Sequence, residues 1–221
     1  IQLVPDLTGR RNAWRERKET LAPTGAFAQG CEQQHPEHHG LPIWSGSSVR
    51  RLRRCAMGLS IALLTISDTR TLADDSSGDQ LQRSLEAADH RLHERQLCPD
   101  DRYQIRRELS RWIADPDVDV VITSGGTGLT GRDGTPEAVV PLLDKTIEGF
   151  GELFRVLSFE SIGTSTLQSR CLAGVANGTF VFVLPGSLDA VTTAWNRLIR
   201  AQLDADTRPC NLAQLRARLK E

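Results

Sequence analysis

The feature that most constrains the fold is a regular alternation of short apolar runs with amphipathic stretches, which begins at Met57. The runs LSIALLTIS (59–67) and VDVVITS (118–124) are almost continuously apolar and have the length of strands. Such runs are typical of strands buried on both faces of a parallel sheet. Residues 78–92 and 101–113 carry apolar side chains at helical spacing. The alternation predicts a mostly parallel sheet between two layers of helices.

The second half of the chain continues this pattern and adds a hairpin. Two apolar runs flank Asn177-Gly178, the dipeptide that most strongly indicates a tight β-turn between strands. Ser187 is well placed to cap an amphipathic helix. The other expected elements are a short strand at 93–98 and helices at 135–144, 149–162, 187–203 and 212–220. We therefore expect an α/β fold of three layers (α/β/α), with a mostly parallel sheet plus a β-hairpin.

Composition excludes several classes of protein. No apolar run approaches the roughly 18 residues of a membrane-spanning helix, so no membrane partner is expected. The formal net charge is −1, which argues against a general nucleic-acid binder. The five cysteines are widely spaced and form no C-x-x-C pair, so neither a disulfide framework nor a zinc site is indicated. A reducing cytoplasm is the expected location.

The first 56 residues differ from the rest of the chain. They carry nine Arg and Lys against five Asp and Glu and show no apolar periodicity. We expect residues 1–56 to be a disordered or non-native extension, or a processed leader, with Met57 as the natural start. Residues 57–221 would then form one domain.

The most unusual stretch of the chain is TSGGTGLTGRDGTPEA (123–138), which leaves a buried strand and leads into a helix. In an open parallel sheet, ligands lie beyond the carboxyl ends of the strands. Glycines allow a ligand to lie against the backbone, and amides at a helix start favour phosphate. The stretch is neither a P-loop nor a G-x-G-x-x-G motif. It predicts a phosphate site, to which Thr127 and Thr130 add hydroxyl groups.

Carboxylates are the second indication of chemistry. Asp133 lies in the middle of the glycine stretch, where an acidic group beside phosphates generally acts through Mg²⁺. Other acidic residues have a simpler interpretation, because carboxylates near a helix start commonly cap it. We expect that role for Asp79 or Asp101. The residue types therefore favour a Mg²⁺-dependent phosphate site without a covalent catalytic group.

Three stretches together resemble the MoaB/Mog family of molybdenum cofactor biosynthesis proteins. They are TSGGTGLTGRDGTPEA (123–138), EGFGELFRVLSFESIGTSTLQSRCLAGVANGTFVFVLPGS (148–187) and DADTRPCN (204–211). The resemblance covers residues 58 to 215, and no part of residues 1–56. It implies a molybdopterin-binding domain of the expected fold, assembled as a trimer or a hexamer.

The resemblance also implies an activity and a set of site residues. The activity is transfer of AMP from MgATP to the terminal phosphate of molybdopterin. By position, Asp133 would hold Mg²⁺ or orient the phosphates, and Asp100 would be a second catalytic carboxylate. The residues implied to surround the ligand and its phosphates are Gly125, Gly126, Thr127, Gly128, Ser67, Asp68 and Ser187.

Two other hypotheses remain open at this stage. The chain could be a non-catalytic oligomeric protein of the same pathway that binds molybdopterin or a nucleotide without releasing pyrophosphate. It could also be a nucleotide-binding domain unrelated to molybdenum. The nucleotide itself could be ATP or GTP.

Overall fold

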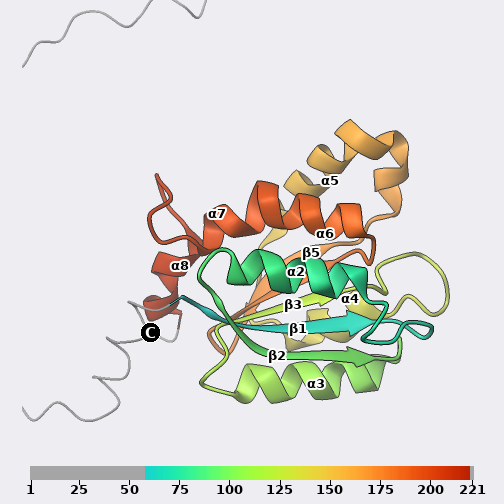
Figure 1. Cartoon of the computed structure of the whole chain (residues 1–221), viewed down its shortest axis with the longest axis horizontal. Coiled ribbons are helices and arrows are strands. Elements are labelled where there is room, and N and C mark those ends of the chain that lie inside the picture. The colour runs from blue at the N-terminus through green and yellow to red at the C-terminus, as the bar shows by residue number, and fades with distance from the viewer. Residues whose placement is uncertain (1–57, 220–221) are drawn as a thin grey trace, which may run out of the picture. The chain divides into compact units, whose positions relative to one another are not determined.

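The computed structural model describes residues 58–219 (Figure 1), so the expectations for residues 1–56 lie outside the described residues. A six-stranded sheet has the order β2-β1-β3-β6-β5-β4. Four neighbouring strands, β2, β1, β3 and β6, are parallel, and β5 and β4 extend the sheet in antiparallel pairs. The strand bounds are β1 Ser60–Ile66, β2 Arg91–Cys98, β3 Val120–Ser124, β4 Lys145–Thr146, β5 Leu172–Ala176 and β6 Thr179–Leu184. The predicted fold class is confirmed.

Helices cover both faces of the sheet (Figure 1). One face packs against α2 (Ser76–Glu86), α5 (Glu148–Ile162) and α6 (Leu188–Ala194), and the other against α3 (Arg102–Ala114) and α4 (Thr135–Val139). The side chains of β1 alternate between the two cores, because successive residues of a strand point to opposite faces. Ile61 and Leu63 lie in one core, and Ala62 and Leu64 in the other.

The hairpin between β5 and β6 is formed as the sequence predicts. Asn177 and Gly178 connect the strands and have positive φ angles of 47° and 79°. Positive φ at both central residues is the requirement of a type I′ turn, which Asn-Gly satisfies with little strain.

The helix predicted at 78–92 begins and ends earlier. It runs from Ser76 to Glu86 and is capped by Asp75, whose carboxylate accepts from the Gly78 amide, so the capping role expected for Asp79 belongs to Asp75. The chain turns at Asp89, which has a φ of 59°, and Leu92 lies in β2. Asp101 caps α3 as expected, accepting from the amides of Tyr103 and Gln104.

Two further helices differ from the expected ranges. The helix expected at 135–144 is α4, which ends at Val139 and passes into a 3-10 turn over Val140–Leu142 that contains Pro141. Proline cannot donate the hydrogen bond that would continue an α-helix. The stretch expected at 187–203 is helical but is divided by a π turn, Trp195–Ile199, into α6 and α7 (Arg200–Leu203).

The last expected helix, at 212–220, is α8 (Leu212–Leu215) followed by a short 3-10 turn. Another 3-10 segment, Gly163–Gln168, extends α5. Within residues 58–219, none of the helices combines the length and the apolar character needed to cross a bilayer.

Candidate functional site

Three loops meet where the parallel strands β1, β3 and β6 end. The loop after β3 begins at Gly125, whose amide donates to the Leu184 carbonyl of β6 at 3.0 Å. A Cβ on Gly125 would lie 2.1 Å from the Ile66 carbonyl oxygen at the end of β1, and its φ is 110°. Gly186, in the turn after β6, lies close to Gly125, because a Cβ on Gly186 would be 3.2 Å from the Gly125 Cα. Gly125 therefore joins the three loops at the centre of this edge.

Gly126 allows Asp100 to approach the same loop. Its φ is 62°, and a Cβ there would lie 2.6 Å from Oδ2 of Asp100 and 2.3 Å from the hydroxyl of Thr135. The other oxygen of Asp100 accepts from the Gly134 amide at 3.2 Å. Asp100 follows β2 in the chain, so its carboxylate connects a fourth loop to the glycine segment.

Asp133 lies in the glycine loop, which connects β3 to α4, and its side chain folds back onto that loop. Its Oδ2 accepts from the amide of Thr130 at 2.8 Å and from the Thr130 hydroxyl at 2.6 Å. The carboxylate also lies against Gly128, where a Cβ would be 2.6 Å from Oδ2. Hydrogen bonding from the Thr130 hydroxyl, aided by the amides of Thr130 and Gly128 and by the charge of Arg170, lowers the pKa of Asp133. Asp133 is therefore an anion held by loop amides.

Asp68 completes a group of three carboxylates. Its Oδ1 accepts from the Asp100 amide at 3.1 Å, and Arg132 donates to its Oδ2 through two nitrogens at 3.0 and 2.7 Å. The Asp100 amide, with help from Arg132, lowers the pKa of Asp68. Burial raises the pKa of Asp100, and the charges of Asp133 and Asp68 raise it further. The three carboxylates thus act on one another at a single edge of the sheet.

This edge suits a divalent cation that arrives with phosphate ligands. Within the described part of the chain, no three His, Cys, Asp or Glu side chains are placed to hold a metal by themselves. Mg²⁺ is ordinarily held by one or two carboxylates together with phosphate oxygens and water. Burial is the main cause that raises the pKa of Asp100, and the charges of Asp133 and Asp68, which a cation would offset, add to it. Asp100 and Asp133 fit a Mg²⁺ ion shared with a phosphorylated ligand.

The two serines of the predicted site accept hydrogen bonds from amides of their own loops. The Ser67 hydroxyl accepts from the amides of Thr69 and Arg70 at 3.3 and 3.1 Å. The Ser187 hydroxyl accepts from the Ala190 amide at 3.2 Å, which confirms its role as the cap of α6. Both residues lie in loops of this edge, and their hydroxyl groups fix the backbone there.

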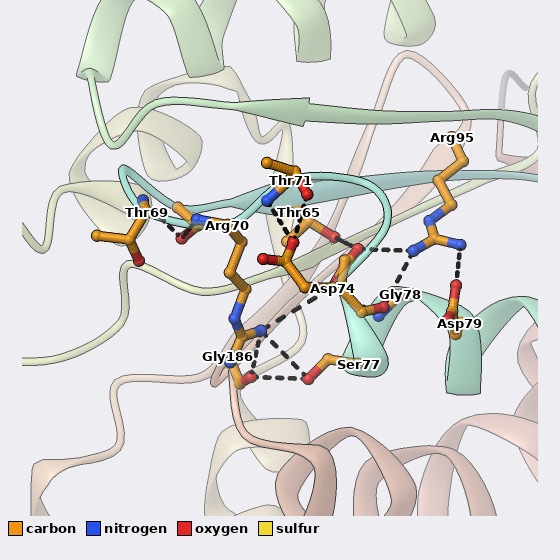
Figure 2. Close-up of polar contacts among 12 residues, drawn as sticks. Thr65, Thr69, Arg70, Thr71, Asp74, Ser77, Gly78, Asp79, Arg95 and Gly186 are labelled. Carbon is orange, nitrogen blue, oxygen red and sulfur yellow. Dashed lines mark hydrogen bonds and ion pairs between the residues drawn. The ribbon is translucent and has the colours of Figure 1, made fainter.

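A partly buried polar cluster connects the loop after β1 to the turn after β6. The carbonyl of Gly186 accepts from Ser77 at 2.8 Å and from Arg70 at 3.2 Å, contacts that Figure 2 shows side by side. In the same cluster, Asp75 is fully buried and pairs with Arg95 at 2.9 Å. The loop that carries Asp68 is thus anchored to the turn after β6, next to Gly125.

Arg170 is one residue of this edge that the sequence pattern does not reveal. It precedes β5, and its guanidinium donates to carbonyls at both ends of the glycine loop, those of Gly128 and Asp133, each at 2.8 Å. It also pairs with the carboxylate of Glu137 in α4. These partners lie 33 to 42 residues away in the chain. No local motif marks such a contact.

Comparison with known proteins identifies the domain. The family model described as "Probable molybdopterin binding domain" matches residues 62–205, which include every predicted site residue. Molybdenum cofactor biosynthesis protein B of Escherichia coli K12 is 55% identical over 151 residues, which are 68% of this chain and 89% of that protein.

Solved structures give the same result. A crystal structure of molybdenum cofactor biosynthesis protein B is 44% identical, with a TM-score of 0.64 over 66% of this chain and 91% of that one. The tungsten cofactor synthesizing protein MoaB from Pyrococcus furiosus is 31% identical, with a TM-score of 0.63 over 74% of this chain and 98% of that one.

Proposed function

The chain belongs to the molybdopterin-binding domain family of molybdenum cofactor biosynthesis proteins, and from this we propose that it transfers AMP from MgATP to molybdopterin. An oxygen of the terminal phosphate of molybdopterin attacks the α-phosphorus of the nucleotide. The new P–O bond forms as the bond to the departing pyrophosphate breaks. ATP is the proposed donor, with GTP as the alternative nucleotide.

The observation that carries this proposal is the convergence of Asp68, Asp100 and Asp133 on one glycine loop. Phosphoryl and nucleotidyl transfer depend on positioning and on electrostatic stabilisation rather than on a covalent protein group. Mg²⁺, when bound, supplies the positive charge that offsets the charge of the phosphates.

The residues of this edge have different roles in the proposed reaction. Asp133 and Asp100 hold and orient the metal-bound phosphates. Gly125, Gly126, Thr127 and Gly128 allow the phosphates to approach the backbone. Ser67, Asp68 and Ser187 surround the ligand from the neighbouring loops.

The test is pyrophosphate release by the full chain supplied with molybdopterin and MgATP. Release that requires both substrates is the expected result. Binding of molybdopterin without release would instead support a non-catalytic binding protein of the same pathway. The observation that favours this second candidate is the engagement of Asp133 by Thr130 within its own loop. Release with either substrate missing would contradict both.

We also propose that the chain forms a homo-oligomer, either a trimer or a hexamer, through α5. One side of α5 faces the core through Phe150 and Phe154. The opposite side and the segment that follows expose large apolar side chains, namely Leu153, Val156, Phe159, Ile162 and Leu167. Monomeric proteins rarely expose so many neighbouring apolar groups. A second copy of the chain would cover them.

A glutamate at Val156, which is 62% exposed, should dissociate the assembly. In the interface the new carboxylate would be buried without a partner, whereas in the monomer it would remain in water. Light scattering coupled to size exclusion should show an oligomer for the wild-type chain and a monomer for Val156→Glu. Leu215→Glu, at an exposed position of α8, is the matched control and should leave the mass unchanged. A monomeric wild-type chain would contradict the proposal.

A further inference from the structure

Arg170 holds the glycine loop through the carbonyls of that loop. Its Nε donates to the carbonyl of Gly128 at 2.8 Å and reaches that of Thr127 at 3.4 Å. A terminal nitrogen donates to the carbonyl of Asp133 at 2.8 Å. The other terminal nitrogen pairs with the carboxylate of Glu137. One side chain thus cross-links both ends of the loop and the helix that follows it.

The planarity of the peptide bond gives these contacts a consequence. The C=O and N–H of one trans peptide unit point in opposite directions. When the Thr127 carbonyl faces Arg170, the Gly128 amide, which belongs to the same peptide unit, must face away from it. The Asp133 carboxylate lies against Gly128, where a Cβ would be 2.6 Å from Oδ2, and the same oxygen accepts from the Thr130 amide at 2.8 Å.

This part of the loop therefore has two sides. The carbonyls of Thr127, Gly128 and Asp133 face the guanidinium of Arg170, whereas the Thr130 amide faces an anion, the Asp133 carboxylate, which also lies against Gly128. A phosphate bound by this loop would need the same amide side, because carbonyl oxygens repel it.

We propose that Arg170 is the positioning residue of the glycine loop: it presents the loop amides to the nucleotide phosphates without contacting the nucleotide itself. This inference rests on the proposed nucleotide site. It also predicts that lysine cannot replace Arg170. A lysine has a single nitrogen, whereas the planar guanidinium spreads its donors over three nitrogens and so spans carbonyls at both ends of the loop.

The experiment compares the full chain with Arg170→Lys. The dissociation constant for MgATP is measured by calorimetry, and kcat and KM by pyrophosphate release. We expect Arg170→Lys to weaken MgATP binding and to lower kcat/KM by about 10- to 100-fold, the range typical of residues that orient a ligand-binding group. Arg197→Lys is the matched control, because Arg197 forms only a surface pair with Glu160 at 3.5 Å. It should leave both quantities unchanged.

The outcomes separate this inference from the proposed reaction. A wild-type chain that binds MgATP without releasing pyrophosphate would overturn the transfer reaction, while the two dissociation constants would still decide the role of Arg170. Equal MgATP affinity in Arg170→Lys and the wild-type chain, with only Tm lowered, would reduce Arg170 to a structural residue and overturn the inference. A wild-type chain without affinity for MgATP would overturn both.

Discussion

Asp133→Asn is expected to lower pyrophosphate release by at least 10²-fold while leaving the protein folded. The loss is of the size found when one preorganised electrostatic contact is removed from a transition state, about 10²–10³ in kcat. The pKa of Asp133 is lowered, first by the Thr130 hydroxyl, so the side chain is a carboxylate at neutral pH. The substitution therefore removes a full negative charge from the proposed phosphate and metal site.

The fold should survive because asparagine keeps the contact that closes the loop. In the wild-type chain, one carboxylate oxygen of Asp133 accepts from both the amide and the hydroxyl of Thr130. The amide oxygen of asparagine can accept the same two hydrogen bonds. The measurement is turnover of the two proteins side by side, with thermal unfolding to show that both are folded at the assay temperature.

Asp74 provides a matched control for this substitution. Its Oδ1 accepts from the amide and the hydroxyl of Thr71, each at 2.6 Å, and Figure 2 shows these two contacts. The four-residue turn is the same as that of Thr130 and Asp133, but it lies on a different loop. Asp74→Asn should therefore keep wild-type turnover. If Asp133→Asn also keeps wild-type turnover, Asp133 only closes a turn, and it has no part in the reaction.

The architecture could be predicted because its signals are local and strong. Strands β1 and β3 are buried on both faces, so they appear in the sequence as continuous apolar runs. Asn177-Gly178 specifies its own turn. The helix boundary at residue 86 could not be predicted, because Leu92 happens to follow Ala88 at helical spacing. The position of Leu92 in β2 depends on pairing with Ile61 of β1, a contact between distant parts of the chain.

The site could be predicted only in part, because some of its residues are marked by local sequence patterns and others are placed by contacts between distant parts of the chain. Glycines and carboxylates mark the loops that carry them, so Asp133 and Gly126 stand out in the sequence. Arg170 and Arg95 do not stand out, because no local sequence pattern marks an arginine that lies just before a strand or within one. Their partners lie far away in the chain: Arg170 donates to Gly128, and Arg95 pairs with Asp75. Only the folded arrangement brings these groups together.

Asp75→Asn is expected to destabilise the fold by about 3–5 kcal/mol, the usual cost of removing one partner from a buried ion pair. Asp75 is fully buried and accepts from the Thr65 hydroxyl at 2.6 Å and from Arg95 at 2.9 Å. Its position also depends on Gly78, where a Cβ would lie 2.1 Å from Oδ2 of Asp75. Asparagine would leave the guanidinium of Arg95, itself largely buried, without its buried counter-charge.

Asp79→Asn is the matched control, because Asp79 pairs with the same arginine at 2.6 Å but is partly exposed. Solvent weakens such a pair, so its loss should cost no more than about 1 kcal/mol. Urea denaturation at pH 7 measures both costs. A cost for Asp75→Asn no greater than that for Asp79→Asn would show that the buried pair contributes no net stability.

The pH dependence of the stability difference between the wild-type chain and Asp75→Asn identifies the origin of that difference. Burial opposes ionisation of Asp75, but the hydrogen bonds from Thr65, Gly78 and Arg95 outweigh it and lower the pKa of Asp75 below the ordinary value of 3.8. A carboxylate with a lowered pKa in the folded state stabilises the fold above its unfolded pKa. That contribution is lost as the pH falls through the folded pKa. The advantage of the wild-type chain over Asp75→Asn should therefore be constant from pH 7 to about pH 5, and it should shrink below the ordinary pKa. An advantage that stays constant to pH 3 would assign the stability to packing around residue 75 rather than to the charge of Asp75.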